Sequence, residues 1–230
     1  YYKEFIGKCK IDIFASGENA PEEMIKMIEH NEQISKLKAR AAVYVVDKTI
    51  PSEVSKKPEN IVEEHMQVGQ GNLVLGLRVN SKKENARFIA SVYNAILGGG
   101  ANSKLFQNVR EKNSLAYTAS STFRRQKDAI FIRCGIEIDK YEKALSTIKE
   151  QIQDMAKGDF TDEDMENAKN LIIGAIKGTT AEQDSEITYY YSQELSESFT
   201  SIEDYINKIE QVSKQDIIEL AKEVWIDTIY

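Results

Sequence analysis

The feature that most constrains the fold is an unbroken alternation of apolar residues near the middle of the chain. Every second residue from Ile130 to Ile138 is apolar, which is the period of a strand with one buried face. The preceding segment, Leu115–Phe123, also has strand character, and a charged run, RRQKD, separates the two segments. The sequence therefore predicts a β-hairpin formed by Leu115–Phe123 and Ala129–Ile138.

Other strands are predicted from the same kind of alternation. The strongest is Gly71–Val79, where leucine or valine occupies every second position from Leu73 onward. Weaker strands are predicted at Lys10–Ala15, Ala41–Val46 and Ile61–Val68, and the chain closes with an apolar stretch at Trp225–Tyr230.

Amphipathic helices are predicted between these strands, because apolar residues recur there at steps of three and four. The predicted start signals are Pro21, Ser81 with Glu84, Asn102 or Ser103, Asp139 with Glu142, Thr161, Ser201 and Ser213. Asn113 is a predicted C-cap, Gly98–Gly100 are expected to end a helix in left-handed backbone, and Gly158 is expected to end a later helix. Strands flanked by separate helices, with a hairpin in the middle, predict an α+β domain of two layers.

The segment Asp47–Asn60 is the predicted boundary between two structural units. It holds two of the three prolines of the chain and many charged residues, which is typical of an exposed connector. The chain starts at Tyr1 with neither an initiator methionine nor a signal segment. We therefore interpret it as a piece of a longer protein.

Charge and composition exclude several classes of partner. The net charge of −7 and the pI near 5.1 argue against nucleic acid and against an anionic membrane surface, because both attract clustered Lys and Arg. The apolar runs are far shorter than the ~20 residues that a membrane-spanning helix requires. The two cysteines, Cys9 and Cys134, are expected to be buried thiols, so a reducing, cytoplasmic location is expected.

The supply of histidine limits the chemistry of the chain. A hydrolytic zinc site needs His and carboxylate ligands at fixed spacing, and the chain has only His30 and His65. The segment IVEEH resembles the inverted zinc motif His-x-x-Glu-His, but Ile61 replaces the first His and the segment is predicted as strand. His30 is expected to be solvated or to interact with a helix C-terminus. The residues predict no metal site, no Ser-His-Asp triad and no phosphate loop.

The segment Leu97–Ser121 remains as a candidate site. Arg110 is predicted in the last turn of a short helix and Tyr117 near the start of the next strand, so both could reach one cleft beside a sheet edge, with Gly98–Gly100 as its loop. A guanidinium and a phenol hydroxyl are suitable donors to a peptide carbonyl, a carboxylate or a developing oxyanion. The alternative is that Arg110 solvates the helix C-terminus and Tyr117 is half-buried core, which the residues alone favour.

Three stretches, in order, resemble the carboxyl-terminal half of the insulinase, or pitrilysin-like, zinc metallopeptidases, the family that includes the mitochondrial processing peptidase. They are QGNLVLGLRV, LGGGANSKLFQNVREKNSLAYTASS and GDFTDEDMENAKNLIIG. The most specific part is Leu105–Tyr117, which is similar to a Leu-Arg-Glu-Lys-type helix end followed by Gly-Leu-x-Tyr. Two departures are Val109 before Arg110, and Asn113-Ser114 where a glycine is common. Asn tolerates left-handed backbone, so the turn is expected to survive.

The resemblance implies a mixed, mainly antiparallel sheet covered by helices over residues 61–230, which would form the substrate-binding domain. Residues 1–46 would be the closing strand-helix-strand segment of a preceding domain, and residues 47–60 the linker. In this family the zinc and the catalytic Glu lie in the amino-terminal half. The other half supplies an Arg and a Tyr seven positions apart to the same chamber, and Arg110 and Tyr117 match that pair.

The resemblance therefore implies the substrate-binding half of a zinc metallopeptidase that acts on unfolded peptides and is inactive alone. Peptide would add as a strand to a sheet edge. Zinc is expected in the amino-terminal half or in a homologous partner subunit, and not in this chain. The alternative function is a non-catalytic structural subunit or scaffold with the same fold. An acidic interaction module unrelated to proteolysis ranks last.

Overall fold

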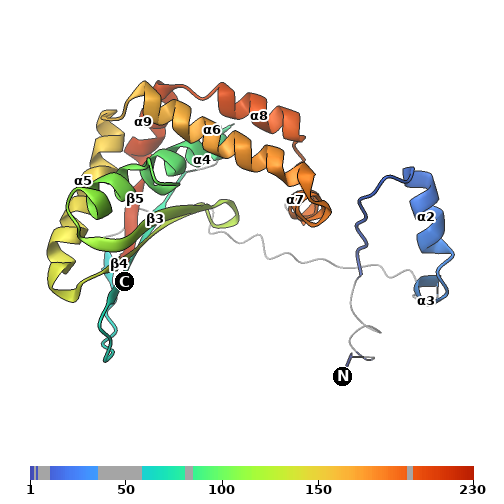
Figure 1. Cartoon of the computed structure of the whole chain (residues 1–230), viewed down its shortest axis with the longest axis horizontal. Helices are drawn as coiled ribbons and strands as arrows, with labels where there is room; N and C mark the ends of the chain where they lie inside the picture. The colour runs from blue at the N-terminus through green and yellow to red at the C-terminus, as the bar shows by residue number, and fades with distance from the viewer. Residues whose placement is uncertain (3, 5–10, 36–58, 81–84, 196–198) are drawn as a thin grey trace. The chain divides into compact units, whose positions relative to one another are not determined.

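A computed structural model describes residues 1–2, 4, 11–35, 59–80, 85–195 and 199–230 of the chain (Figure 1). The chain divides into two compact units. The smaller is made of residues 1–50 and 178–199, and the larger of residues 51–177 and 200–230. The predicted linker at 47–60 lies almost entirely outside the described residues, so that boundary stays a prediction.

Within its described residues, the larger unit is built on one five-stranded sheet with the order β1-β5-β2-β4-β3. Its strands are β1 (Asn60–Ile61), β2 (Gly71–Arg78), β3 (Ala116–Arg124), β4 (Ala129–Ile136) and β5 (Trp225–Ile229). Strand β2 is antiparallel to both β4 and β5, and β3 is antiparallel to β4, while β1 runs parallel to β5. The predicted mixed, mainly antiparallel sheet is confirmed.

The hairpin at the centre of the sequence is confirmed. Strands β3 and β4 pair antiparallel along their length. The charged turn forms a 3-10 turn, Arg125–Lys127, which Asp128 closes in left-handed backbone at φ 46°. Ile138 continues the alternation but lies beyond the end of β4 and is exposed. The other alternating residues of β4 are all buried: Ile130, Ile132, Cys134 and Ile136.

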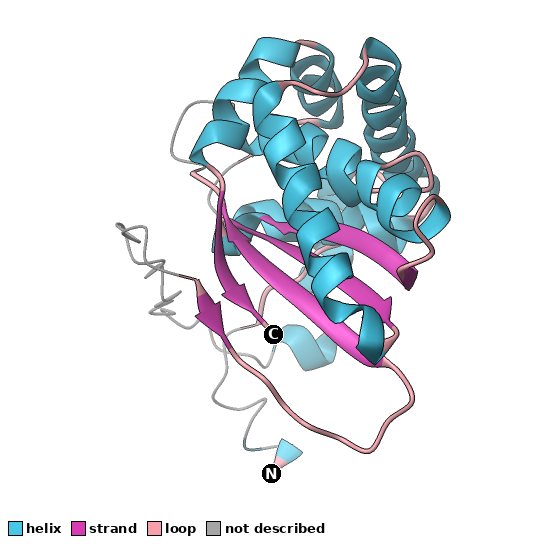
Figure 2. Cartoon of the chain, turned by 90° about the vertical axis from the view of Figure 1, so that its left-hand side faces the viewer, coloured by secondary structure: helices cyan, strands magenta, loops and turns pink. Residues whose placement is uncertain are grey.

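Helices of the larger unit gather on one face of this sheet, and none of the described helices of that unit covers the other face (Figures 1 and 2). They are α4 (Ala86–Gly98), α5 (Tyr141–Lys157), α6 (Asp162–Gly178), α8 (Ile202–Glu210) and α9 (Lys214–Glu223). Helices α4 and α5 contact the strands, and α8 and α9 pack on α4. The predicted two-layer α+β architecture is confirmed. Among the described residues, no helix is both long and apolar enough to cross a membrane.

The core lies between this sheet and the helices. Every second residue of β2, together with Val79 just beyond its end, faces the helices, as the period of two predicts. The apolar faces of the amphipathic helices pack against these side chains. The buried side chains include Leu73, Leu75, Leu77 and Val79 from this strand, Phe88, Val92 and Ile96 from α4, and Ile148, Ile152 and Met155 from α5. Burial of each such side chain contributes about 1.5–3 kcal/mol relative to exposure.

Three of the predicted helix starts are confirmed by their hydrogen bonds. The hydroxyls of Thr161, Ser201 and Ser213 accept the backbone N–H three residues further on, at 3.0, 3.0 and 3.2 Å. Each bond satisfies a donor that the first helical turn would otherwise leave without a partner. At the other end of α5, the predicted helix end at Gly158 is also confirmed, and this glycine has left-handed backbone at φ 78°.

One predicted helix start is wrong. Asp139 and Glu142 do not cap α5, because a 3-10 turn occupies Ile138–Lys140 and α5 begins directly after it. The N-cap residue is Lys140, and it makes no side-chain capping bond. The predicted Ser81–Glu84 capping box lies outside the described residues.

Two of the weaker strand predictions are also wrong. In Ile61–Val68 only Ile61 belongs to a strand, and residues 11–15 form no strand. A strand needs a neighbour that takes its backbone hydrogen bonds. Ile61 has such a neighbour in β5, but no described segment pairs with residues 63–68 or with residues 11–15. The predicted strand Ala41–Val46 lies outside the described residues.

The smaller unit contains α2 (Pro21–Glu29), α3 (Glu32–Ser35) and α7 (Gln183–Leu195). The helix predicted from Pro21 to about His30 is confirmed as α2. The segment before it contacts α7, since Ser16 donates to a Glu186 carboxylate oxygen at 2.6 Å. The ring centroids of Phe14 and Tyr191 are 5.0 Å apart. No residue of α2 is buried.

Candidate functional site

Arg110 lies on a short π-helix, η1 (Phe106–Glu111), which follows the loop after α4. The Ser103 hydroxyl accepts the N–H of the first η1 residue at 3.4 Å, which confirms Ser103 as the predicted start signal. The sequence predicts an ordinary short helix here, but the Lys112 N–H bonds the Gln107 carbonyl oxygen, five residues back, at 2.9 Å. Such wide turns are frequent at functional sites.

A single residue in left-handed backbone, Ser114 at φ 50°, joins η1 to β3. Its N–H donates to the Arg110 carbonyl oxygen at 3.0 Å. The prediction that Asn113 caps this helix in left-handed backbone is wrong. The Asn113 side chain instead donates to the Asn108 carbonyl oxygen at 2.6 Å, and the reversal occurs one residue later.

The Gly98–Gly100 run allows close packing. None of the three glycines has a positive φ, so the prediction of left-handed backbone is wrong at these positions. A Cβ at Gly98 would lie 2.5 Å from the backbone nitrogen of Ser121, and one at Gly99 would lie 2.6 Å from the Cα of Ala95. The absence of a side chain at Gly98 therefore lets the end of α4 approach β3, and its absence at Gly99 lets the following loop pack on α4 itself.

Arg110 and Tyr117 line the same surface depression. Its volume is about 400 Å³, and its other lining residues include Gly98–Gly100, Phe106 and Thr118–Ser120. The Arg110 side chain is 42% exposed and Tyr117 is 59% exposed, so the interpretation of Tyr117 as half-buried core is wrong. The guanidinium carbon of Arg110 lies 4.5 Å from the centroid of the Phe106 ring, within the range of a cation–π contact.

A β-bulge presents Tyr117 at the start of β3. Ala116 pairs with Ile136 and Thr118 pairs with Gly135, so Tyr117 is an extra residue between two consecutive positions of β4. A bulge leaves its extra residue out of the ladder and changes the direction of its side chain. Strict alternation in the sequence does not predict this, because an inserted residue shifts the period by one.

β3 lies at the edge of the sheet. Within the described part of the chain it pairs with β4 alone, which leaves the backbone groups along its other edge without a ladder partner. Ser120 and Thr122, on this strand, are exposed polar residues. An unpaired edge of this kind can accept an extended peptide as an added strand.

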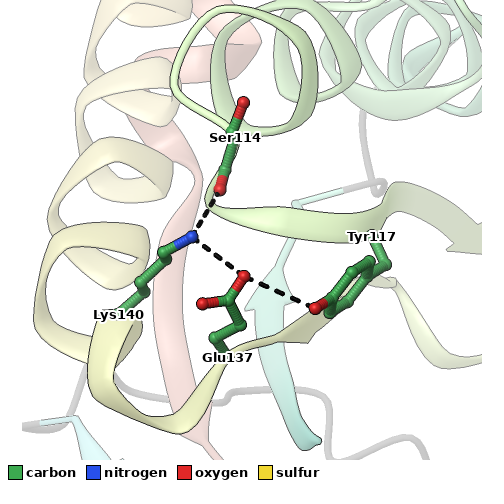
Figure 3. A network of polar contacts seen from close by, with 4 residues as sticks. All are labelled: Ser114, Tyr117, Glu137 and Lys140. Carbon is green, nitrogen blue, oxygen red and sulfur yellow. Dashed lines mark hydrogen bonds and ion pairs between the residues drawn. The ribbon is translucent and has the colours of Figure 1, made fainter.

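A second depression, of about 370 Å³, is also lined by Arg110 and Tyr117 and holds an ion pair. Figure 3 shows that the Lys140 ammonium contacts both Glu137, at 2.9 Å, and the Ser114 carbonyl oxygen, at 3.1 Å. The Tyr117 hydroxyl donates to the same Glu137 oxygen at 3.4 Å. Sequence reasoning missed Glu137 and Lys140. The available signal was a pair of opposite charges three residues apart, at the end of a strongly predicted strand.

The ion pair shifts the titration of both partners. The hydrogen bond from Lys140 lowers the pKa of Glu137, and the same bond raises the pKa of Lys140. Both shifts favour the charged forms. Near neutral pH the Glu137 carboxylate therefore acts only as a hydrogen-bond acceptor.

The described residues do not fit a zinc site. They contain no group of three or more His, Cys, Asp or Glu side chains that could hold a metal ion. The His65 side chain is 94% exposed and its Nε2 lies 3.9 Å from a Glu63 carboxylate oxygen, in a loop and not on a helix. His30 follows α2 as its C-cap, with Nδ1 2.7 Å from the Lys26 carbonyl oxygen, which confirms the predicted interaction with a helix end.

Cys134 is confirmed as a buried thiol, free of any disulfide. Burial raises its pKa to about 12, which keeps the sulfur protonated and unreactive near neutral pH. Cys9 lies outside the described residues.

Residues 1–172 match the family model described as "Peptidase M16 inactive domain". The chain is 31% identical to "Probable inactive metalloprotease YmfF" of Bacillus subtilis over 230 residues, which are 100% of this chain and 53% of that protein. It is 24% identical to "Uncharacterized zinc protease YmxG" of the same organism, over 75% of this chain and 44% of that protein. The chain thus spans about half the length of these curated relatives.

Solved structures share the fold. A conserved protein from Enterococcus faecalis has a TM-score of 0.75 at 22% identity, covering 92% of this chain and 49% of its own. A peptidase M16 inactive domain from Pseudomonas fluorescens has a TM-score of 0.64 at 19% identity, covering 74% of this chain and 42% of its own.

Proposed function

The chain belongs to the peptidase M16 inactive-domain family, and on that premise we propose that it is the substrate-binding, non-metal-binding half of a zinc metallopeptidase that acts on unfolded peptides. In this proposal the chain holds the peptide and does not hydrolyse it alone. The observation that carries it is the position of Arg110 and Tyr117, which are both exposed and line one depression beside the unpaired edge of β3.

The edge of β3 supplies the sequence-tolerant part of the binding. An extended peptide can pair with the backbone groups that β4 leaves free, because backbone hydrogen bonds do not depend on side-chain identity. The exposed hydroxyls of Ser120 and Thr122 keep this edge polar. A peptide already buried in a fold cannot offer its backbone in this way, so the proposed substrates are unfolded.

Arg110 and Tyr117 supply the directional part. Both offer hydrogen-bond donors, and a guanidinium is always charged. The cation–π contact with Phe106 supports the Arg110 side chain from one side and leaves 42% of it exposed. In the proposed complex the pair binds a carbonyl oxygen or carboxylate of the peptide, or an oxyanion that develops on it.

In this proposal the zinc is held outside the described part of this chain. Because the described residues do not fit a zinc site, we assign the metal to an amino-terminal half or to a homologous partner subunit. This chain's share of the work is to bind and orient the peptide.

The test is binding of a fluorescein-labelled, unstructured peptide of mixed sequence, measured by fluorescence anisotropy. We expect Arg110→Ala to weaken binding about tenfold and Tyr117→Phe about fivefold, since each removes hydrogen bonds to the peptide. Arg78→Ala and Tyr141→Phe are matched controls that remove the same groups elsewhere on the larger unit, away from both depressions, and they should bind like the unmodified chain.

Two outcomes contradict this function. Unchanged binding in both Arg110→Ala and Tyr117→Phe would remove the pair from the site. Hydrolysis of the peptide by this chain alone, abolished by a metal chelator, would show that the chain carries its own metal centre.

A second function, a non-catalytic structural subunit or scaffold, is favoured by one specific observation. The relative that matches the whole chain at 31% identity is named a probable inactive metalloprotease. Zinc content and peptide hydrolysis of the chain together with its amino-terminal half separate the two proposals. Bound zinc with hydrolysis supports the peptidase, and absence of both supports the scaffold.

A further inference from the structure

We propose that Lys140 is a positioning residue for the Arg110/Tyr117 pair, acting through Ser114 on one side and through Glu137 on the other. The inference rests on the proposed function, because it names what holds the two peptide-binding side chains in register. Lys140 and Glu137 line the second depression, whereas the peptide is assigned to the first.

Hydrogen bonds form a continuous path between the segments that carry the pair, and Figure 3 shows the part of it from Ser114 to Tyr117. The Ser114 N–H donates to the Arg110 carbonyl oxygen at 3.0 Å, and the Ser114 carbonyl oxygen accepts from Lys140 at 3.1 Å. Lys140 also donates to Glu137 at 2.9 Å, and Glu137 accepts from the Tyr117 hydroxyl at 3.4 Å. One ammonium group therefore links the helix end that carries Arg110 with the bulge that carries Tyr117.

The left-handed residue Ser114, which connects η1 to β3, needs stabilisation by contacts from other parts of the chain. Left-handed backbone at φ 50° is unfavourable for a residue with a Cβ. This joint sets the angle between η1 and β3, and hence the separation of the Arg110 and Tyr117 side chains. The bond from Lys140 to the Ser114 carbonyl oxygen is a charge-assisted bond at that point.

Backbone contacts fix the positions of Glu137 and Lys140. Glu137 directly precedes one 3-10 turn and Lys140 is its last residue, and the Lys140 N–H donates to the Glu137 carbonyl oxygen at 3.0 Å. The turn lies between β4, whose last residue Ile136 is buried, and α5, whose first turn contains buried Ala144. A site held by rigid elements keeps its geometry better than one held by loops.

The hydrogen bond between Tyr117 and Glu137 is long enough for the hydroxyl to exchange this partner for a peptide oxygen. At 3.4 Å it is longer than the usual range of an O–H···O hydrogen bond, roughly 2.5–3.0 Å. Glu137 thus serves as a resting partner that keeps the ring in place, while the hydroxyl can turn toward a peptide oxygen. An exposed ion pair adds little to folding stability, so the effect of Lys140 should appear in geometry and binding.

The first test is a double-mutant cycle with the labelled unstructured peptide. We expect Lys140→Met to weaken peptide binding about fivefold, the effect of one hydrogen bond, and Lys140→Arg to restore most of it. In the Tyr117→Phe background the same Lys140→Met change should have a smaller effect, because one of the two groups that it positions is gone. Lys143→Met, on the same helix, is the matched control.

The second test does not depend on the peptide. The chain is labelled with [13Cζ]tyrosine, and the Tyr117 signal is assigned by its loss in Tyr117→Phe. Lys140→Met and Glu137→Ala should each shift the Tyr117 signal, while Lys143→Met should leave it unchanged.

The outcomes separate this inference from the proposed function. A Tyr117 signal that Lys140→Met leaves unchanged overturns the positioning role, and so does an equal loss of binding in the Tyr117 and Tyr117→Phe backgrounds. A shifted Tyr117 signal in a chain that binds no peptide keeps the positioning role and rejects the proposed function.

Discussion

Helices α2 and α4 are both amphipathic, yet only one of them buries its apolar stripe. In α4, residues such as Phe88, Val92 and Ile96 are buried against the sheet and neighbouring helices. In α2, no residue is buried, and Ile25 and Met27 are 54% and 67% exposed. The stripe therefore predicts a helix in both places but does not indicate what covers it. Most helical stability in proteins comes from the covering surface.

The largest effect should come from a matched truncation of isoleucine in each helix. We expect Ile96→Ala to lower the free energy of unfolding by about 2–5 kcal/mol, through lost burial and a residual cavity. Ile25→Ala, at an exposed position, should change it by no more than about 0.5 kcal/mol. Urea unfolding followed by circular dichroism and by fluorescence of Trp225, the only tryptophan of the chain, measures both. Equal losses of unfolding free energy in the two variants would mean that another surface buries the apolar stripe of α2.

Two glycines, one closely packed and one in open space, provide a second comparison between buried and exposed positions. Gly98→Ala would place its Cβ 2.5 Å from the Ser121 nitrogen, so we expect it to destabilise the larger unit by about 1–3 kcal/mol. Gly174→Ala in α6 meets nothing within 4 Å and should stabilise the helix by up to about 1 kcal/mol. Thermal unfolding of the two variants provides the measurement. A stabilising Gly98→Ala would contradict the close approach of α4 to β3.

The smallest effect should come from the exposed ion pair of Glu137 and Lys140. The pKa of Glu137 is lowered and that of Lys140 is raised. The stabilisation by the pair is therefore fully present between the ordinary pKa values of Glu and Lys, about 4.3 and 10.4. It is lost as the pH falls through the lowered pKa of Glu137 or rises through the raised pKa of Lys140.

Carboxyl 13C titration of Glu137 tests this pH dependence. Its midpoint should lie below the ordinary value in the unmodified chain and rise in Lys140→Met. The other charged side chains around it, Asp139, Glu111 and Arg110, are unchanged in that variant. Lys143→Met should leave the midpoint where it is. A midpoint that Lys140→Met does not move would show that the contact with Lys140 does not control Glu137.

Period and capping chemistry predicted the local structure best where the neighbours of a segment lie in the same unit or a few residues away along the chain. The alternation in Ala129–Ile138 predicted β4 because its apolar face meets helices that the chain itself supplies. Thr161 and Ser213 predicted helix starts because a cap bonds a backbone group only three residues away. Residues 11–15 have similar alternation but form no strand, because no described segment offers the hydrogen bonds of a neighbouring strand.

The candidate site was only partly predictable for the same reason. Spacing and family resemblance led to Arg110 and Tyr117, but not to the π-turn that carries Arg110 or the bulge that presents Tyr117. Neither feature produces a repeating pattern of apolar residues in the sequence. Glu137 and Lys140 were missed because they reach Tyr117 and Ser114 through a separate turn, more than fifteen residues away along the chain.

The sequence by itself determined the hairpin, most of the helices around it, the lack of a His-x-x-Glu-His motif, and the family of the chain. These depend on periods, short-range hydrogen bonds and residue identities. Only the tertiary structure decided that Gly98 and Gly99 serve close packing, that Ser114 is the left-handed joint, and that Lys140 contacts both sides of the site. Those features depend on which distant surfaces meet, because van der Waals contacts and hydrogen bonds act over a few ångströms of space regardless of separation along the chain.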